Sequence, residues 1–174
     1  MIRRPPRSTP SNSSAASDVY KRQLSQGVPM TLRITDVFGF LNEKVDGDPY
    51  SVGRGCSLVY YEGVPHIAYF DVSFNQVKHA WIENGRWVKE VVGEGFTWNT
   101  NLSAGRSHLV VCYTGKGRKT ILISRRESSL WKRSVVVSGE MLGWKTSMVI
   151  DRKGKAHVVF TTPDHKLWIV SERR

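Results

Sequence analysis

Three histidines have the residue type and spacing that could form a metal site. His66, His108 and His157 stand in the strand-like runs PHIAYF, SHLVVCY and AHVVFT. Neutral imidazoles that converge on one axis could bind zinc. Residues at one position of a repeat normally have the same packing role in every copy, so we expect these three to pack within the fold and predict no metal site.

Two carboxylates could do a different chemistry. Asp71 follows the PHIAYF run, and Asp164 follows the AHVVFT run. Most glycosidases need two carboxyl groups about 5–10 Å apart. Asp71 and Asp164 are the one pair that comes from matching turns, and we expect a pair of solvated turn residues rather than a catalytic dyad. The sequence therefore predicts no catalytic residue and no cofactor.

The composition excludes several classes of protein. The 174 residues include 26 Lys+Arg and 15 Asp+Glu, which leaves a net charge of +11, and 40% are hydrophobic. This hydrophobic fraction can build a core, and no apolar run reaches the ~18 residues of a membrane span. Cys56 and Cys112 are too few for a disulfide scaffold or a four-thiolate zinc site, and we expect buried, inert thiols. The basic residues scatter over many turns, which predicts no specific nucleic-acid partner and at most nonspecific adhesion to polyanions.

The first residues differ from the rest of the chain. Residues 1–23 contain three of the seven prolines and almost no large apolar side chains, so they cannot bury enough surface to become ordered. IRRPPRSTP followed by SDVYKRQ also resembles the conceptual translation of sequencing-adapter DNA. We predict a disordered or artefactual tail over residues 1–29 and treat Met30 as a candidate start. The localisation stays open because no signal peptide is visible.

From Met30 onward, strand-like runs alternate with turns about every eight to twelve residues, with no helical period. Asn84-Gly85 is the strongest hairpin signal, because both residues tolerate the positive φ of a type I′ turn. The runs recur with a period of about 45 residues, seen most clearly at Leu58, Leu102 and Met148. The repeating unit is a four-stranded antiparallel meander.

Such a unit is typical of a β-propeller blade. The predicted fold is therefore all-β, a partial β-propeller of about three four-stranded antiparallel blades within residues 30–174. Closed propellers have four to eight blades, so about three blades leave the edges of the first and last blades open. Such open blade edges favour self-association. Thr31–Val37 is interpreted as an orphan fourth strand, and the last blade lacks its own fourth strand. The predicted blades span residues 57–92, 99–137 and 145–174.

The segments GVPHIAYFDVSFNQVKHAWIENGRWVKEVV and WKTSMVIDRKGKAHVVF resemble the repeats of sialidase-like β-propeller proteins. The hallmark Asp-box, S-x-D-x-G-x-T-W, is absent, since Val91 and Gly93 stand where Ser and Asp belong. The resemblance implies that ligands meet the loops between the second and third strands of each blade and between successive blades. No arginine cluster assembles on that face. The candidate ligand-binding residues there are Asp71, Asn75, Trp98, Trp144, Asp164 and His165.

Three functions remain open on the sequence alone. The first is a non-catalytic binding or scaffold propeller, with a glycan as the favoured ligand, on which Trp98 and Trp144 could stack if they do not simply close the packing between blades. The second is a truncated sialidase-like glycoside hydrolase whose catalytic residues lie in other blades. The third is a surface that binds polyanions. The absent Asp-box and the missing catalytic set favour the first.

Overall fold

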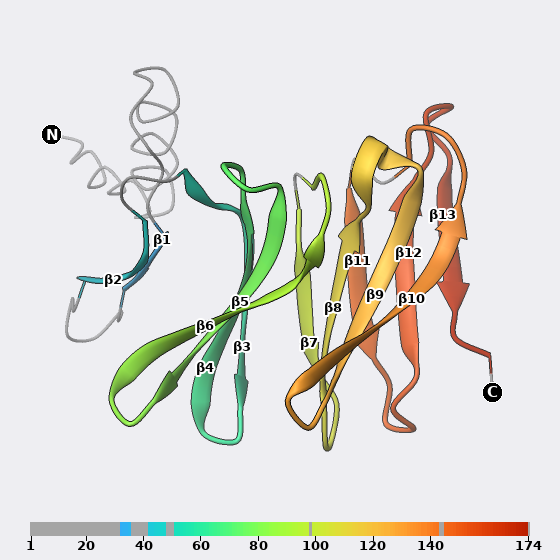
Figure 1. Ribbon diagram of the computed structural model, residues 1–174. Coiled ribbons are helices and arrows are strands. Elements are labelled where there is room, and N and C mark those ends of the chain that lie inside the picture. Colours follow the sequence, from blue (N-terminus) through green and yellow to red (C-terminus); the bar gives the residue numbers. More distant parts are fainter. Residues whose placement is uncertain (1–31, 36–41, 48–50, 98, 143–144, 174) are drawn as a thin grey trace, which may run out of the picture.

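The computed structural model describes residues 32–35, 42–47, 51–97, 99–142 and 145–173. The predicted tail, residues 1–29, lies outside these ranges. The described residues form β-strands and turns, with a single 3₁₀ turn, η1 (Lys116–Arg118), as their helical element (Figure 1). Within these ranges no helix has the length and apolar character needed to span a membrane. The prediction of an all-β chain is confirmed.

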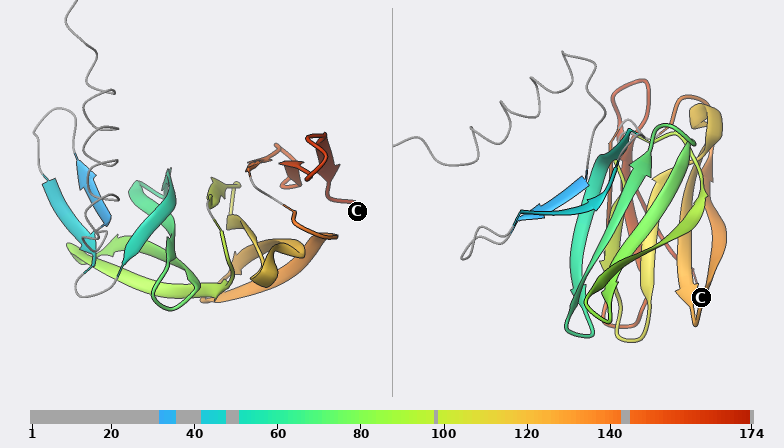
Figure 2. Two further views of the ribbon diagram at one scale, coloured as in Figure 1. Left: turned by 90° about the horizontal axis from the view of Figure 1, so that it is seen from above. Right: turned by 60° about the vertical axis from the view of Figure 1, so that its left-hand side comes forward.

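The strands form four antiparallel sheets, each from strands that are consecutive in the sequence. The two-stranded sheet contains β1 (Leu32–Thr35) and β2 (Asn42–Asp46). The first four-stranded sheet contains β3 (Val52–Tyr61), β4 (Val64–Asp71), β5 (Gln76–Glu83) and β6 (Arg86–Glu94). The second contains β7 (Asn101–Ala104), β8 (Leu109–Thr114), β9 (Thr120–Glu127) and β10 (Leu130–Ser138). The three-stranded sheet contains β11 (Thr146–Ile150), β12 (Ala156–Thr161) and β13 (Leu167–Ser171). Seen from above, the sheets stand side by side along an arc (Figure 2).

The predicted Asn84-Gly85 hairpin is confirmed. Glu83 pairs with Arg86 across the two-residue turn, and φ is +50° at Asn84 and +72° at Gly85. Positive φ at both central residues is the requirement of a type I′ turn, whose twist matches that of the flanking strands. The turn therefore fixes the register of β5 against β6.

The predicted repeat is confirmed in the strand register. Leu58 pairs with Ile67 in the first four-stranded sheet, and Leu102 pairs with Val111 in the second. Met148 pairs with Val158 in the three-stranded sheet. These pairs place Leu58, Leu102 and Met148 at equivalent positions of three antiparallel meanders.

The same register corrects the histidine prediction. His66 pairs with Val59, and His157 pairs with Val149, which makes His66 and His157 equivalent. The residue at this position of the second sheet is Val110, which pairs with Ser103. His108 precedes β8 and lies two residues earlier in the repeat. The shared spacing of the three histidines was therefore misleading.

The interpretation of Thr31–Val37 as a fourth strand is also wrong for its described part. Leu32–Thr35 forms β1 and pairs with β2. Asp46 in β2 precedes Glu90 in β6 by the 44 residues that also separate Glu90 from Ser134 in β10. The spacing thus puts β2 in the fourth-strand position and β1 in the third. At the other end of the chain, β13 has no further strand beside it among the described residues.

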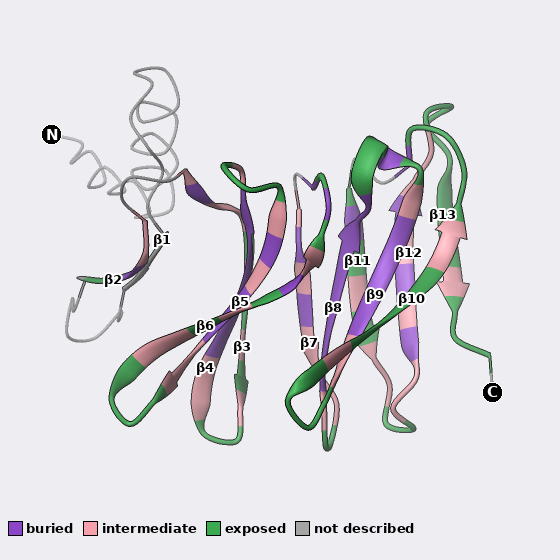
Figure 3. Cartoon of the chain, viewed as in Figure 1, coloured by how far each residue is buried: buried purple, intermediate pink, exposed green. Residues whose placement is uncertain are grey.

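The cores lie between neighbouring sheets (Figure 3). Strand β8 is buried along its whole length, because its side chains alternate between two cores. One core joins the four-stranded sheets and the other joins the second of them to the three-stranded sheet; the first contains Ala68, Phe70, Val77, Val92, Leu102, Leu109, Val111, Tyr113 and Leu122, and the second Val110, Cys112, Ile121, Ile123, Leu142, Ala156, Val158 and Phe160. A third cluster packs Val45 of β2 on the first four-stranded sheet.

The prediction that both cysteine thiols are buried is confirmed for Cys112 and wrong for Cys56. Cys112 is buried, and burial raises the pKa of its thiol to about 12. Cys56 is exposed. It lies on β3, near two shifts in the pairing of β3 with β4.

Candidate functional site

A groove lies where the first and second four-stranded sheets meet. The turns that line it are at the upper edge in Figure 1. We call it the rim groove, and its volume is about 510 Å³. It is formed by the β4–β5 turn, the end of β6 and the segment around η1. Its lining residues are Phe74, Asn75, Glu94, Gly95, Phe96, Lys116, Gly117 and Arg118.

One wall of the rim groove is a turn held by Asp71. The Oδ1 atom of Asp71 accepts hydrogen bonds from the backbone N–H groups of Ser73 (3.0 Å) and Phe74 (3.2 Å). An aspartate that accepts from the N–H two residues ahead is an Asx-turn. Asn75 completes the turn with φ of +53°, and its carbonyl accepts from the N–H of Gly95 at 3.1 Å. The turn is thereby fixed to the end of β6.

The floor of the groove depends on a close backbone approach. The N–H of Phe96 donates to the carbonyl of Thr114 at 3.1 Å, which joins the two sheets. A Cβ atom on Gly95 would lie 2.7 Å from that same carbonyl oxygen. Glycine at this position therefore lets the sheets approach. The ring of Phe96 in turn packs edge-on against Phe70, with centroids 6.4 Å apart.

The groove offers aromatic surface beside polar groups. Phe74 and Phe96 are 51% and 39% exposed, and Lys78 Nζ lies 5.7 Å from the centre of the Phe74 ring. Glu94 and Lys116 are exposed and supply opposite charges. Arg118 is buried and donates from Nη2 to the carbonyl of Met141 at 3.2 Å, so its guanidinium holds the loop in place. The combination suits a polar ligand that also has apolar C–H faces.

The structure separates the six predicted site residues. Asn75 lines the rim groove. Asp71 lies beneath it and is fully buried, so it positions the turn rather than meeting a ligand. His165 and Asp164 lie in the exposed turn between β12 and β13. Trp98 and Trp144 lie outside the described residues.

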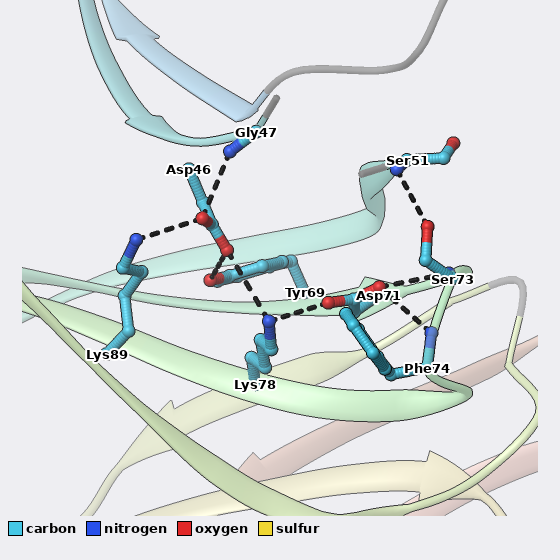
Figure 4. A network of polar contacts seen from close by, with 9 residues as sticks. All are labelled: Asp46, Gly47, Ser51, Tyr69, Asp71, Ser73, Phe74, Lys78 and Lys89. Carbon is cyan, nitrogen blue, oxygen red and sulfur yellow. Dashed lines mark hydrogen bonds and ion pairs between the residues drawn. The ribbon is translucent and has the colours of Figure 1, made fainter. Parts of the chain in front are cut away.

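Asp71 belongs to a network that links three strands to β2 (Figure 4). Its Oδ2 atom contacts Lys78 Nζ at 2.6 Å. Lys78 also lies 3.8 Å from Asp46, which accepts hydrogen bonds from the Tyr69 hydroxyl (2.7 Å) and from Lys89 Nζ (2.9 Å). Burial opposes ionisation of Asp46, but the bonds from Tyr69 and Lys89 outweigh it and hold its pKa below the usual value. The network docks β2 on the first four-stranded sheet.

Asp71 and Asp164 do not form a pair. They belong to the first four-stranded sheet and the three-stranded sheet, and the second four-stranded sheet lies between these two (Figure 1). Hydrogen bonds from Lys166 and Thr162 lower the pKa of Asp164 to about 2. Asp164 is solvated as expected, whereas Asp71 is not.

The three predicted histidines also have separate partners. His66 Nδ1 lies 2.9 Å from His79 Nε2, and His108 is hydrogen-bonded to Arg125. His157 contacts Ser171 at 2.8 Å and Asp151 at 3.3 Å. Within the described part of the chain, no three His, Cys, Asp or Glu side chains gather in a way that could hold a metal ion.

Sequence reasoning missed a polar cluster between the four-stranded sheets. Glu90 Oε1 accepts hydrogen bonds from Arg126 Nε (3.0 Å) and Trp131 Nε1 (2.9 Å) of the second sheet. It also accepts from His79 Nδ1 at 2.9 Å, and His79 contacts His66. We call these five residues the Glu90 cluster. One sequence signal could have pointed to Glu90: the equivalent residue of the next repeat, 44 positions later, is Ser134 rather than a carboxylate.

The histidines of the Glu90 cluster predict a pH-dependent stability. Burial, followed by the charges of His79 and Arg126, lowers the pKa of His66 to about 4. The unfolded chain, with an imidazole pKa near 6.5, binds more protons between these values, so stability falls as the pH drops below about 6.5. We expect the free energy of unfolding to fall by about 1 kcal/mol from pH 7.5 to pH 5.5. Urea titrations at both pH values measure it.

The matched variant for this prediction is His66→Gln, which keeps a polar side chain but cannot titrate. It should reduce the difference between the two pH values. An unchanged difference would mean that other groups cause the pH dependence.

Comparisons with known proteins give little beyond this geometry. No family model matches the sequence, and no curated protein matches it. Among solved structures, the chain is similar to a hypothetical protein from Leishmania major, with a TM-score of 0.49 and 12% sequence identity. The match covers 93% of this chain and 53% of the other, so this chain spans about half the length of that protein.

Proposed function

We propose that the chain is a partial, sialidase-like β-propeller that binds a glycan without catalysing a reaction. The propeller assignment is supported by three equivalent antiparallel meanders standing along an arc (Figure 2). The open edges of such an assembly also favour self-association. The rim groove is the proposed binding site.

The single observation that carries the glycan proposal is the aromatic surface within the rim groove. Phe74 and Phe96 expose ring surface beside Asn75, Glu94 and Lys116. Sugar rings present apolar C–H patches, which pack on aromatic faces, and hydroxyl groups, which bond to amide and charged side chains.

The proposal of a non-catalytic role rests on the carboxylates. Glu94 is the one carboxylate that lines the described groove, and Asp71 beneath it is occupied by Lys78 and by the turn. Glycoside hydrolysis of the common kind uses two carboxyl groups that flank the bond. A truncated glycoside hydrolase would need its second catalytic carboxyl group from residues that do not line the rim groove.

Replacing Phe74 should weaken glycan binding. Sialyllactose and cellotetraose are the acidic and neutral probes, and saturation-transfer NMR followed by calorimetry measures their binding. We expect Phe74→Ala to weaken binding of the tighter-binding probe about fivefold, because an aromatic contact contributes about 1 kcal/mol.

The control is Tyr60→Ala, which removes an aromatic ring that is 70% exposed on β3, outside the groove lining. This variant should bind normally. If Phe74→Ala bound the probe as tightly as the unchanged chain, the assignment of the site to the rim groove would be contradicted. Turnover of a fluorogenic sialoside would contradict the non-catalytic role.

A further inference from the structure

Two turns at the edge opposite the rim groove collect basic side chains. The β7–β8 turn carries Arg106, and the β11–β12 turn carries Arg152, Lys153 and Lys155 (Figure 1). We call these four residues the basic patch. Arg106, Arg152 and Lys153 are exposed, and Lys155 is half-buried. In the equivalent turn of the first four-stranded sheet, between β3 and β4, an acid stands instead, Glu62. The basic charge at this edge is therefore concentrated in two turns.

Arg125 of β9 holds these two turns side by side. Its Nη1 atom donates to the carbonyl of Gly154 in the β11–β12 turn at 3.2 Å, and it is also hydrogen-bonded to the ring of His108 in the β7–β8 turn. Burial and the charge of Arg125 lower the pKa of His108, so its ring is neutral at pH 7 and adds no charge. The basic patch is therefore a single preorganised surface, which reduces the entropy cost of binding.

The basic patch differs from other exposed cations because it has no acidic partner. Lys166, for example, pairs with Asp164 at 2.8 Å. Within the described ranges, no ion pair with a carboxylate involves a residue of the basic patch. The carboxylate of the same turn, Asp151, is already occupied, since its Oδ1 atom accepts from the backbone N–H groups of Lys153 (2.8 Å) and Lys155 (2.9 Å). Like charges held close together repel one another, and a polyanion relieves that repulsion.

We propose that the basic patch binds a sulfated polysaccharide. Sulfate groups recur along such a chain, and contacts with the four cations release the counterions that surround it. Nucleic-acid recognition uses aromatic side chains on which bases stack, or an element that enters a groove of the duplex. The two turns, AGRSHL and DRKGKA, contain no Phe, Trp or Tyr and are short, which favours the polysaccharide. The basic patch lies at the other edge of the sheets from the rim groove, so this proposal does not rest on glycan binding there.

The probe is a heparin octasaccharide, and calorimetry with the full chain measures its binding over a range of salt concentrations. The double variant Arg106→Gln/Arg152→Gln removes one cation from each turn. At about 50 mM salt it should weaken binding at least about tenfold, and it should lower the slope of log K against log salt by about two, one for each lost contact. The matched control is Lys119→Gln/Lys166→Gln, which removes the same charge from side chains that are 67% and 68% exposed at the other edge. The control should bind as the unchanged chain does.

Two further probes leave the protein unchanged. A desulfated octasaccharide should not bind, because it lacks the charges that the basic patch contacts. A DNA duplex of similar length should bind more weakly than heparin; if it bound as tightly and lost affinity in Arg106→Gln/Arg152→Gln, the partner would be a nucleic acid and the proposal would be overturned. Equal weakening of heparin binding in the two double variants would show that net charge alone attracts heparin. That result, or no heparin binding at about 50 mM salt, would also overturn the proposal.

Discussion

Glu90→Gln is expected to lower the free energy of unfolding by about 2–3 kcal/mol. Glu90 is 22% exposed. Its Oε1 atom alone accepts three hydrogen bonds, from Arg126, Trp131 and His79. Glutamine retains the shape but removes the charge that faces Arg126. Urea unfolding, followed by tryptophan fluorescence, measures the loss.

Glu83→Gln is the control for this change. Glu83 is exposed at the end of β5, beside the Asn84-Gly85 turn. Surface substitutions of this kind usually change stability by less than about 0.5 kcal/mol. If Glu90→Gln were as mild as Glu83→Gln, the Glu90 cluster would not hold the sheets together.

Asp71→Ala is expected to cost more, about 3–5 kcal/mol, because it removes one partner of a buried pair. The Asp71 carboxylate is fully buried and contacts Lys78 at 2.6 Å, and its other oxygen accepts from two N–H groups of the β4–β5 turn. Among the described residues, the variant leaves Asp46, at 3.8 Å, as the one carboxylate near the ammonium group of Lys78. The urea midpoint should fall accordingly.

Asp164→Ala is the matched control, since Asp164 stands in the turn that corresponds to that of Asp71. Its carboxylate is exposed and bonds only to its neighbours Thr162 and Lys166. The urea midpoint should therefore stay unchanged. Equal losses in the two variants would show that the burial of Asp71 does not matter for stability.

The repeat and the hairpins could be predicted from the sequence because local rules fix them. Alternating apolar residues define a strand, and Asn84-Gly85 fixes a turn through the φ angles it tolerates. Leu58, Leu102 and Met148 kept the period because each occupies the same place in a meander. The candidate site was predicted only in part, through Asn75.

The failures concern residues whose surroundings come from distant segments. Asp71 looks like a solvated turn residue until Lys78 of the next strand and the packed sheet bury it. His108 shares the approximate spacing of the other histidines but not their register, because it lies three residues before Val111, whereas His66 and His157 lie one residue before the equivalent Ile67 and Val158. The partners of Glu90 lie 36 and 41 residues away on another sheet, and no local pattern encodes such a contact.

The Glu90 cluster also decides in which order the sheets separate. Both junctions have a charged hydrogen bond, Glu90 with Arg126 at the first and Glu172 with Arg125 at the second. Glu172 is 38% exposed, whereas Glu90 is 22% exposed and accepts three bonds, and a more exposed pair contributes less to stability. At the second junction Ser134 also stands in place of Glu90, beside a cavity. In a chain of stacked units, each boundary contributes its own stability. The three-stranded sheet is therefore the first unit to detach, and proteolysis should begin there while the two larger sheets remain a single cooperative block.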